Sequence, residues 1–368
     1  MSIDVLTAQN IRPLAPTVPL RALAATSYVP VLDGLRAVSV GLVIISHLLI
    51  FDTDPNSLYQ FGIACGATGV SVFFVISGYL ITSLLLREED RTGGVNLKNF
   101  YVRRFLRIFP AAYLFLAVLL LLKLSGIIEM NWHSYIASLL YVRNLIGSGH
   151  ETSHLWSLSI EEQFYLIWPA LLLLLSHARR LQITAGIVLA VCAWRSYLVM
   201  GGKLVPGQAY NRTDLRIDTI LVGCILAFLV RTEYFRRWNE RWLVHPLTAV
   251  AGLLALVLTK WAALEIAFSE SLESTLSALF ICILVNWFLH NDSSRIARWL
   301  QFSPVLFVGK MSYGIYLWQQ LFLGPHEGAM RVLRGFPVGF VLSFLAAAVS
   351  YFLLEKPALR LKARFAPQ

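Results

Sequence analysis

The sequence predicts an all-α integral membrane protein, a bundle of about ten transmembrane helices around a central cavity. Hydrophobic residues make up 57% of the chain and charged residues only 14%, which is too few charges for a soluble domain of this size. Apolar runs of about 17 to 22 residues recur, the length that crosses a bilayer. Polar residues recur inside these runs. Because such residues are costly against lipid, they indicate an internal cavity.

The ten predicted spanning helices cover residues 33–52, 66–87, 105–124, 158–177, 181–200, 214–231, 245–261, 271–290, 303–324 and 336–354. Lys and Arg concentrate in alternate connections, as in 231–241, whereas connection 52–57 holds aspartates and neither Lys nor Arg. The positive-inside rule then predicts that both termini are cytoplasmic. The same rule accounts for the net charge of +10, so we expect no nucleic-acid partner.

The flanking and connecting segments complete the predicted organisation. Residues 1–30 read as a cytoplasmic lead-in of little order, 31–357 as the transmembrane domain, and 358–368 as a cytoplasmic tail. Segment 131–147 has a short apolar core that contains Arg143, so we predict a helix on the outer surface rather than a span.

The first helix carries two ionisable residues on one face. Arg36 and His47 are eleven residues apart, about three helical turns or roughly 16 Å. A neutral imidazole in a dry pocket is a good general base. A histidine bonded to a neighbouring helix and an arginine that reaches the headgroups remain the alternatives.

The third helix begins with a cationic group. Arg103, Arg104 and Arg107 form one surface in "NFYVRRFLRIFP". They would suit the phosphates of a nucleotide-bearing thioester. An ordinary basic flank of a membrane helix is the alternative.

The stretch "HLWSLSIEEQFYLIWP" places Glu161 and Glu162 near the outer start of a spanning helix. They would complement the helix dipole, or one could point inward to orient or protonate a histidine. Four cysteines with no paired spacing predict no metal site. The remaining residues predicted to line the cavity or contact the acceptor are Ser77, Trp156, Ser157, Ser159, Arg216, Asp218, Tyr313, Tyr316 and Gln319. For Arg216 and Asp218, a structural ion-pair lattice is the alternative.

These motifs, in their order, resemble the acyltransferase 3 family of bacterial membrane O-acyltransferases. The resemblance rests on "LDGLRAVSVGLVIISHL", "GVSVFFVISGYLI", "FYVRRFLRIFP", "HLWSLSIEEQFYLIWP", "RTDLRIDTILVG", "SYGIYLWQQ" and "EKPALRLK", and covers about 30 to 360. It implies an enzyme of the bacterial inner membrane that moves an acyl group, usually acetyl, from acyl-CoA to a hydroxyl. The implied acceptors include surface polysaccharides and glycolipids, and no cofactor stays bound.

The resemblance also implies roles for individual residues. Arg36 and His47 match the family's arginine–histidine pair for acyl transfer, and Arg104 with Arg107 matches its arginine pair on the third helix. Glu161 and Glu162 match its tryptophan–serine–glutamate motif. Gln319 stands where many relatives have a histidine. The hydrolase-like extension of some relatives is not expected here, so transfer would end in the membrane domain or on a separate partner.

The predicted mechanism docks CoA by its phosphates at the third-helix arginines on the cytoplasmic side and threads the thioester toward His47. His47 then acts as general base or first accepts the acyl group. Glu162 or Glu161 orients the imidazolium, and Arg36 holds the donor or a developing negative charge. The alternative is a non-catalytic transporter or flippase of lipid-linked glycans. ATP-driven transport is not expected, because no Walker loop occurs.

Overall fold

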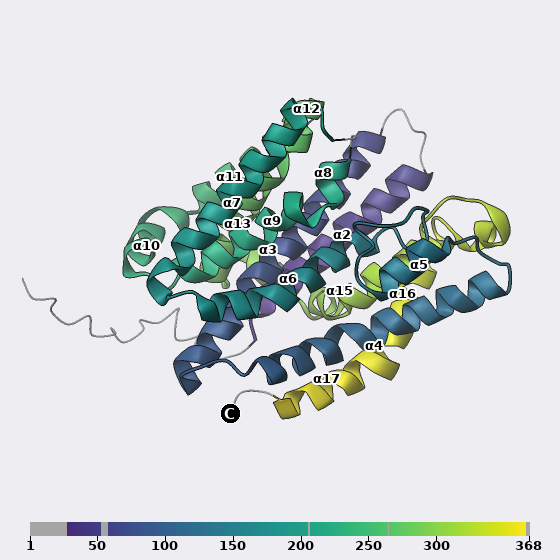
Figure 1. Cartoon of the computed structure of the whole chain (residues 1–368), viewed down its shortest axis with the longest axis horizontal. Coiled ribbons are helices and arrows are strands. Elements are labelled where there is room, and N and C mark those ends of the chain that lie inside the picture. Colours follow the sequence, from purple (N-terminus) through teal and green to yellow (C-terminus); the bar gives the residue numbers. More distant parts are fainter. Residues whose placement is uncertain (1–27, 53–57, 205–206, 264, 366–368) are drawn as a thin grey trace, which may run out of the picture.

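The computed structural model describes residues 28–52, 58–204, 207–263 and 265–365, and these are helical with no strand among them (Figure 1). Most of the predicted lead-in, 1–30, lies outside the described residues. The α-helices are α2 (Pro30–Asp52), α3 (Tyr59–Thr92), α4 (Leu97–Leu124), α5 (Trp132–Leu139), α6 (Leu155–Leu174), α7 (His177–Met200), α8 (Gln208–Asn211), α9 (Thr213–Leu229), α10 (Glu233–Trp238), α11 (Pro246–Ala262), α12 (Ile266–Ser271), α13 (Glu273–His290), α14 (Arg295–Leu300), α15 (Ser303–Phe322), α16 (Val338–Ser350) and α17 (Lys356–Lys362).

Each of the ten predicted spans overlaps a helix, but fewer helices qualify as spans by length and apolarity. Among the described residues six do: Pro30–Phe51, Tyr59–Thr92, Leu97–Leu124, His177–Met200, Glu273–His290 and Val338–Lys362. A pair bent by 87°, Glu233–Leu243 with Pro246–Ala262, would make a seventh. Helices α6, α9 and α15 do not qualify because α9 is short and the other two carry interior polar residues. The count of about ten spans is therefore not confirmed.

Helix α3 is the most buried of the candidate spans, and it packs against α2, α9 and α13. Two glycines set its approach to α9. A Cβ added to Gly78 would lie 1.9 Å from the carbonyl oxygen of Ile220, and one added to Gly223 would lie 2.1 Å from that of Val75. Small residues at such crossings let membrane helices pack backbone to backbone. Gly78, next to Ser77, therefore serves close packing between α3 and α9.

Segment 131–147 does not span a membrane in this fold. Its helix, α5, has eight residues, which at 1.5 Å each reach only about 12 Å. The chain then continues as a loop to His154, beside the long α4 (Figure 1). Trp132, Ile136 and Leu140 are exposed along this segment, as expected for a surface helix.

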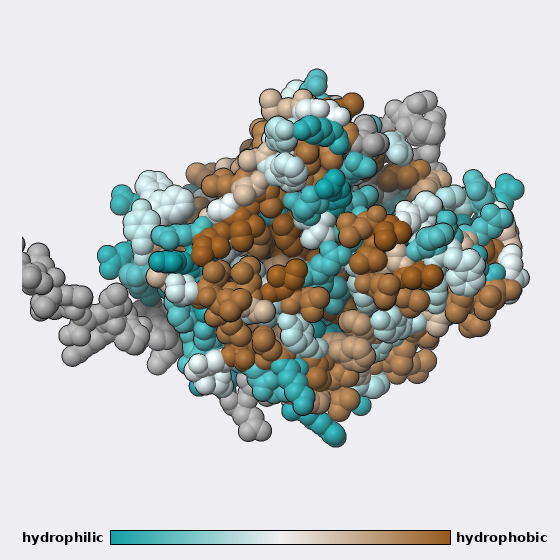
Figure 2. All heavy atoms as spheres, in the orientation of Figure 1, coloured by the Kyte–Doolittle hydropathy of each residue, from teal (hydrophilic) through white to brown (hydrophobic). Residues whose placement is uncertain are grey.

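Large apolar side chains cover much of the molecular surface. Figure 2 shows hydrophobic residues across the face in view, with hydrophilic residues gathered toward its edges. Leu174, Leu189 and Trp261 are more than two-thirds exposed, at 83%, 70% and 72%. A soluble domain would bury such residues, so this surface fits a multi-pass membrane protein.

Candidate functional site

Three neighbouring cavities follow α2 from one end to the other. We call them the His47 cavity (about 980 Å³), the middle cavity (about 90 Å³) and the arginine cavity (about 580 Å³). Val70 and Tyr316 line both the His47 and the middle cavity. Arg36, Arg104 and Arg107 line both the middle and the arginine cavity. Adjacent cavities therefore share walls.

His47 lines the largest of these three cavities. Its Nδ1 lies 2.9 Å from the carbonyl oxygen of Val43, one helical turn earlier. A carbonyl accepts only, so Nδ1 must carry the proton and donate it. In the neutral ring the lone pair is then on Nε2, which is the form that can act as a base.

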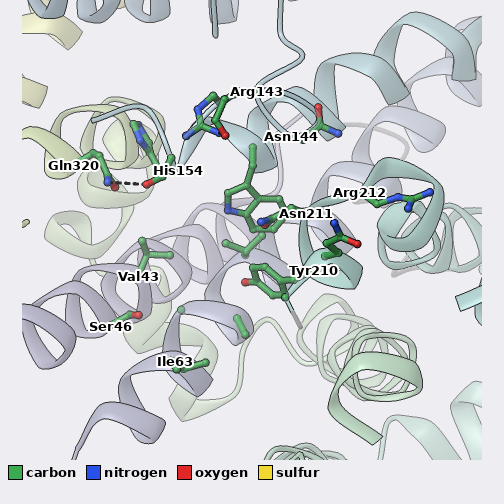
Figure 3. Close-up of a pocket in the computed structure, with 18 of the residues that line it drawn as sticks. Val43, Ser46, Ile63, Arg143, Asn144, His154, Tyr210, Asn211, Arg212 and Gln320 are labelled. Atoms are coloured by element: carbon green, nitrogen blue, oxygen red, sulfur yellow. Dashed lines mark hydrogen bonds between the residues drawn. The ribbon is translucent and has the colours of Figure 1, made fainter. Parts of the chain in front are cut away.

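Gln320 and two loop histidines surround the same end of α2. The Gln320 amide donates to the carbonyl oxygen of His150 at 2.7 Å and to Oγ of Ser153 at 3.0 Å. Its side chain also interacts with His47, and Figure 3 shows Gln320 beside His154 at the cavity wall. His154 lines the cavity as well, and neither of its buried ring nitrogens has a hydrogen-bond partner among the described residues.

Both loop histidines are held neutral. Burial, with the nearby His47 as a smaller cause, lowers the pKa of His150 to about 4. Burial also lowers the pKa of His154 well below its usual value.

The loop that carries these histidines is braced from two sides. Within it, the Arg143 guanidinium donates to Oγ1 of Thr152 at 3.0 Å and to the carbonyl oxygens of Gly147 and Gly149. From outside, Arg334 forms a buried ion pair with Glu151 at 2.7 Å. The histidines thus reach the cavity through contacts far apart in sequence, and no local motif marks them.

The middle cavity holds a serine–carboxylate pair. Ser77 donates to Oε1 of Glu161 at 2.5 Å, and the Tyr165 hydroxyl lies 3.4 Å from the same oxygen. The Arg104 guanidinium stands 4.8 Å from the centre of the Tyr165 ring. The middle cavity therefore holds a few polar groups in a wall that is otherwise largely apolar.

Among the described residues, several cations of the arginine cavity form no ion pair with a carboxylate, and Arg104 and Arg107 are two of them. Arg103 is neutralised by Glu88 at 2.7 Å and also donates to the carbonyl oxygen of Phe365. By contrast, no carboxylate in the described part of the chain forms an ion pair with Arg104 or Arg107. Lys362 adds a further positive charge to the lining. Partly buried cations without carboxylates favour an anionic ligand.

Comparison with known proteins shows the family of the chain. Residues 29–355 match the Acyl_transf_3 family model, described as an acyltransferase domain. The chain belongs to the acyltransferase 3 family. The peptidoglycan O-acetyltransferase OatA of Listeria monocytogenes is 34% identical over 90% of this chain and 56% of that protein. The O-acetyltransferase OatA of Staphylococcus aureus is 31% identical over 92% of this chain and 58% of that protein. No solved structure matches the chain.

The chain spans a little over half the length of these relatives. The family model, which matches residues 29–355, covers the linings of the His47 and middle cavities and all of the arginine cavity except Tyr28, Leu359 and Lys362. What the relatives share with this chain is therefore the helical membrane domain that carries the site.

The other predicted site residues fall into two groups. Trp156 lines the His47 cavity, and Ser157, Tyr313 and Tyr316 line the middle cavity, with the Ser157 and Tyr316 hydroxyls 2.5 Å apart. Ser159 instead donates to the carbonyl oxygen of Leu155 and lines none of the three.

Four predictions differ from the observed placement. Gln319 is fully buried, and the glutamine that lines the cavity is Gln320, because the helical turn points only one of the two inward. Glu162 lines no described cavity. Within the described residues, no hydrogen bond joins Glu161 or Glu162 to His47. Asp218 forms a buried ion pair with Arg195 of α7 at 3.0 Å, a structural role with a partner that lies outside the lattice expected from the sequence.

Proposed function

We propose that the chain is a membrane O-acetyltransferase that moves an acetyl group from cytoplasmic acyl-CoA to a hydroxyl of a cell-surface glycan. The observation that carries the proposal is the combination of two arginines, Arg104 and Arg107, that have no carboxylate partner in the described residues with a histidine cavity on the far side of the middle cavity. Membership of the family and the names of the relatives, one of them a peptidoglycan O-acetyltransferase, support it.

In this proposal the CoA phosphates bind in the arginine cavity, where Arg104 and Arg107 need an anion to offset their charge. Lys362 lines the same cavity and adds to the attraction. Arg103 contributes less than expected from its position, because Glu88 already pairs with it. Arg36, paired with Asp33 at 2.9 Å, lines the entrance to the middle cavity and guides the pantetheine arm inward.

The acceptor hydroxyl enters from the His47 cavity and meets the thioester near the middle cavity. It gives its proton to Nε2 of His47 while its oxygen bonds to the thioester carbonyl carbon. The carbon–sulfur bond then breaks, and the CoA sulfur leaves with the electron pair and takes up the proton from the His47 imidazolium, which returns His47 to its neutral form. General base catalysis of this kind typically contributes 10²- to 10⁴-fold.

Glu161 has a different role in this proposal from the one expected from its motif. It holds Ser77 in the middle cavity and balances the charge of Arg104 and Arg36 while the thioester passes. An acyl-His47 intermediate is the second route for the same residues, since Nε2 can attack the thioester directly and then pass the group to the acceptor.

We further propose that the protein lies in the bacterial inner membrane, with both termini and the arginine cavity on the cytoplasmic side. Basic residues at this end, such as Arg87 and Lys310, agree with the positive-inside rule. A glycan transporter or flippase would also use cavities at both ends. It would bind glycan without releasing CoA.

The test uses purified protein in proteoliposomes with radiolabelled acetyl-CoA, following CoA release and label on a glycan-lipid extract. We expect turnover by wild type and at least a 100-fold loss in His47→Ala. The exposed His133→Ala is the matched control and should keep wild-type turnover. Equal turnover in His47→Ala would remove His47 from the mechanism. Absence of turnover with retained glycan binding would favour the transporter.

The donor side has its own test. The double variant Arg104→Gln with Arg107→Gln should raise KM for acetyl-CoA, since two charge-assisted contacts are lost. Exposed Arg179→Gln is the matched control. An unchanged KM in the double variant would refute the proposed donor site.

A further inference from the structure

A fourth cavity, of about 140 Å³, lies beside the His47 cavity among α3, α7, α8, α9, α11, α12 and α13. We call it the side cavity. Ile63, Ala67 and Tyr210 line both spaces, so the two are neighbours across these residues. Figure 3 shows Tyr210 and Ile63 at the edge of the His47 cavity. A molecule that occupies the larger space can therefore extend a substituent toward the smaller one.

The charges around the side cavity balance in pairs. Arg195 is paired with Asp218, and Lys260 with Glu273. The two remaining charged residues of the lining are Arg216 and Glu270. With three cations and three carboxylates, this environment favours neither an anion nor a cation, so a neutral ligand fits it.

Arg216 and Glu270 each keep one hydrogen-bonding atom unused. Arg216, only 1% exposed, donates from Nη2 to Ser71 at 3.0 Å, and its Nε has no partner in the described part of the chain. Glu270 accepts from the backbone N–H of Gly207 at 2.8 Å through Oε1, whereas its buried Oε2 likewise lacks one. Unpaired buried polar atoms are costly, so each such atom calls for a partner.

A ligand for these two atoms must offer one acceptor to Arg216 and one donor to Glu270. A secondary amide has both, in its carbonyl oxygen and its N–H. Four alanines, Ala64, Ala67, Ala209 and Ala263, form the apolar part of the wall and fit a methyl group. The volume of the side cavity is larger than a single hydroxyl group requires.

We propose that the side cavity is a subsite for the acetamido group of an amino sugar in the acceptor glycan. The inference rests on the proposed function for the presence of a glycan in the His47 cavity. Tyr210 stacks over the Arg216 guanidinium, 4.7 Å from it, and forms the boundary that the substituent passes. The side cavity would thus select amino sugars from sugars that carry only hydroxyls.

The test measures equilibrium binding, which needs no acyl-CoA. The probes are the tetrasaccharide of N-acetylglucosamine and cellotetraose, which differ in acetamido versus hydroxyl groups at the same ring position. We expect wild-type protein in detergent to bind the acetamido probe about tenfold more tightly, the value of one to two buried hydrogen bonds. Glu270→Gln should lose most of this preference.

A second variant tests the volume of the side cavity rather than the charged residues that line it. Ala64→Leu fills the side cavity and should reduce the preference to near unity while leaving the affinity for cellotetraose unchanged. Exposed Ala178→Leu is the matched control and should bind both probes as wild type does.

Equal binding of the two probes by wild type, or binding of neither, would overturn the subsite and leave the side cavity as a hydrated ion-pair network. An unchanged preference in both Glu270→Gln and Ala64→Leu would do the same. A preference for the acetamido probe in protein that turns over no acetyl-CoA would keep the subsite and refute the transferase. The two proposals therefore fail separately.

Discussion

Gly223→Ala should destabilise the membrane domain by driving α3 and α9 apart. The added Cβ would lie 2.1 Å from the carbonyl oxygen of Val75 and 2.9 Å from the backbone nitrogen of Tyr79. Both neighbours are backbone atoms of a buried helix, so no flexible side chain can turn away. An ordinary contact needs at least about 3.4 Å, so the helices must separate. Overpacking of this kind costs about 1–3 kcal/mol.

Gly41→Ala is the matched control, because nothing lies within 4 Å of the Cβ that it adds. Replacement of a helical glycine by alanine should by itself gain up to about 1 kcal/mol. The control variant should therefore be as stable as wild type or more so, and Gly223→Ala less stable despite the same gain in helix propensity. The comparison separates the cost of the close helix crossing from the effect of losing a glycine.

The assay is the midpoint of thermal unfolding in detergent, followed by intrinsic fluorescence and by the loss of the monodisperse peak in size exclusion. We expect a midpoint several degrees below that of Gly41→Ala. The crossing also sets the place of Ser77 against Glu161, so turnover should fall more than stability alone explains. Equal midpoints for the two variants would refute the argument that backbone contact fixes this crossing.

Glu151→Gln should destabilise by about 3–5 kcal/mol, because it leaves the Arg334 charge buried without its partner, and the thermal midpoint in detergent checks this. Stability should be full above pH 6.5 and fall as the pH drops toward 4, because the pKa of His150 is about 4 in the folded protein and the unfolded chain takes up the proton first. His150→Asn should flatten that part of the pH profile, and an unchanged profile would refute the role of this group. Arg103→Gln should raise KM for acetyl-CoA less than Arg104→Gln does, because Arg103 is already paired, and a larger effect in Arg103→Gln would contradict this ranking.

The candidate site explains why the spacing of residues along one helix predicts only part of their placement. Arg36 and His47 share a helix and a side, as their separation predicts, yet they line different cavities. Glu161 and Glu162 are adjacent in sequence, but only Glu161 lines the middle cavity, with Ser77 as its partner from α3. Helical periodicity gives direction relative to one axis. It cannot tell which neighbouring helix faces that direction.

The two loop histidines could not be predicted from the sequence for another reason. His150 and His154 lie in a connection with no helical period, and neither was among the predicted site residues. Their placement depends on Arg143 inside the loop and on the ion pair between Glu151 and Arg334, which are 183 residues apart. Such long-range contacts exist only after the chain has folded.

By itself the sequence determined the helical membrane class, the positions of the main helices and the family, because apolar length and motif order are local properties of the chain. It also identified His47, Arg104 and Arg107, since ionisable residues stand out in apolar runs. Only the tertiary structure decided which charges are neutralised. Arg103 has Glu88 as a partner, whereas Arg104 and Arg107 have no carboxylate partner in the described ranges. Pairing depends on distances between helices, and those distances are set by packing, as at the glycine crossing of α3 and α9.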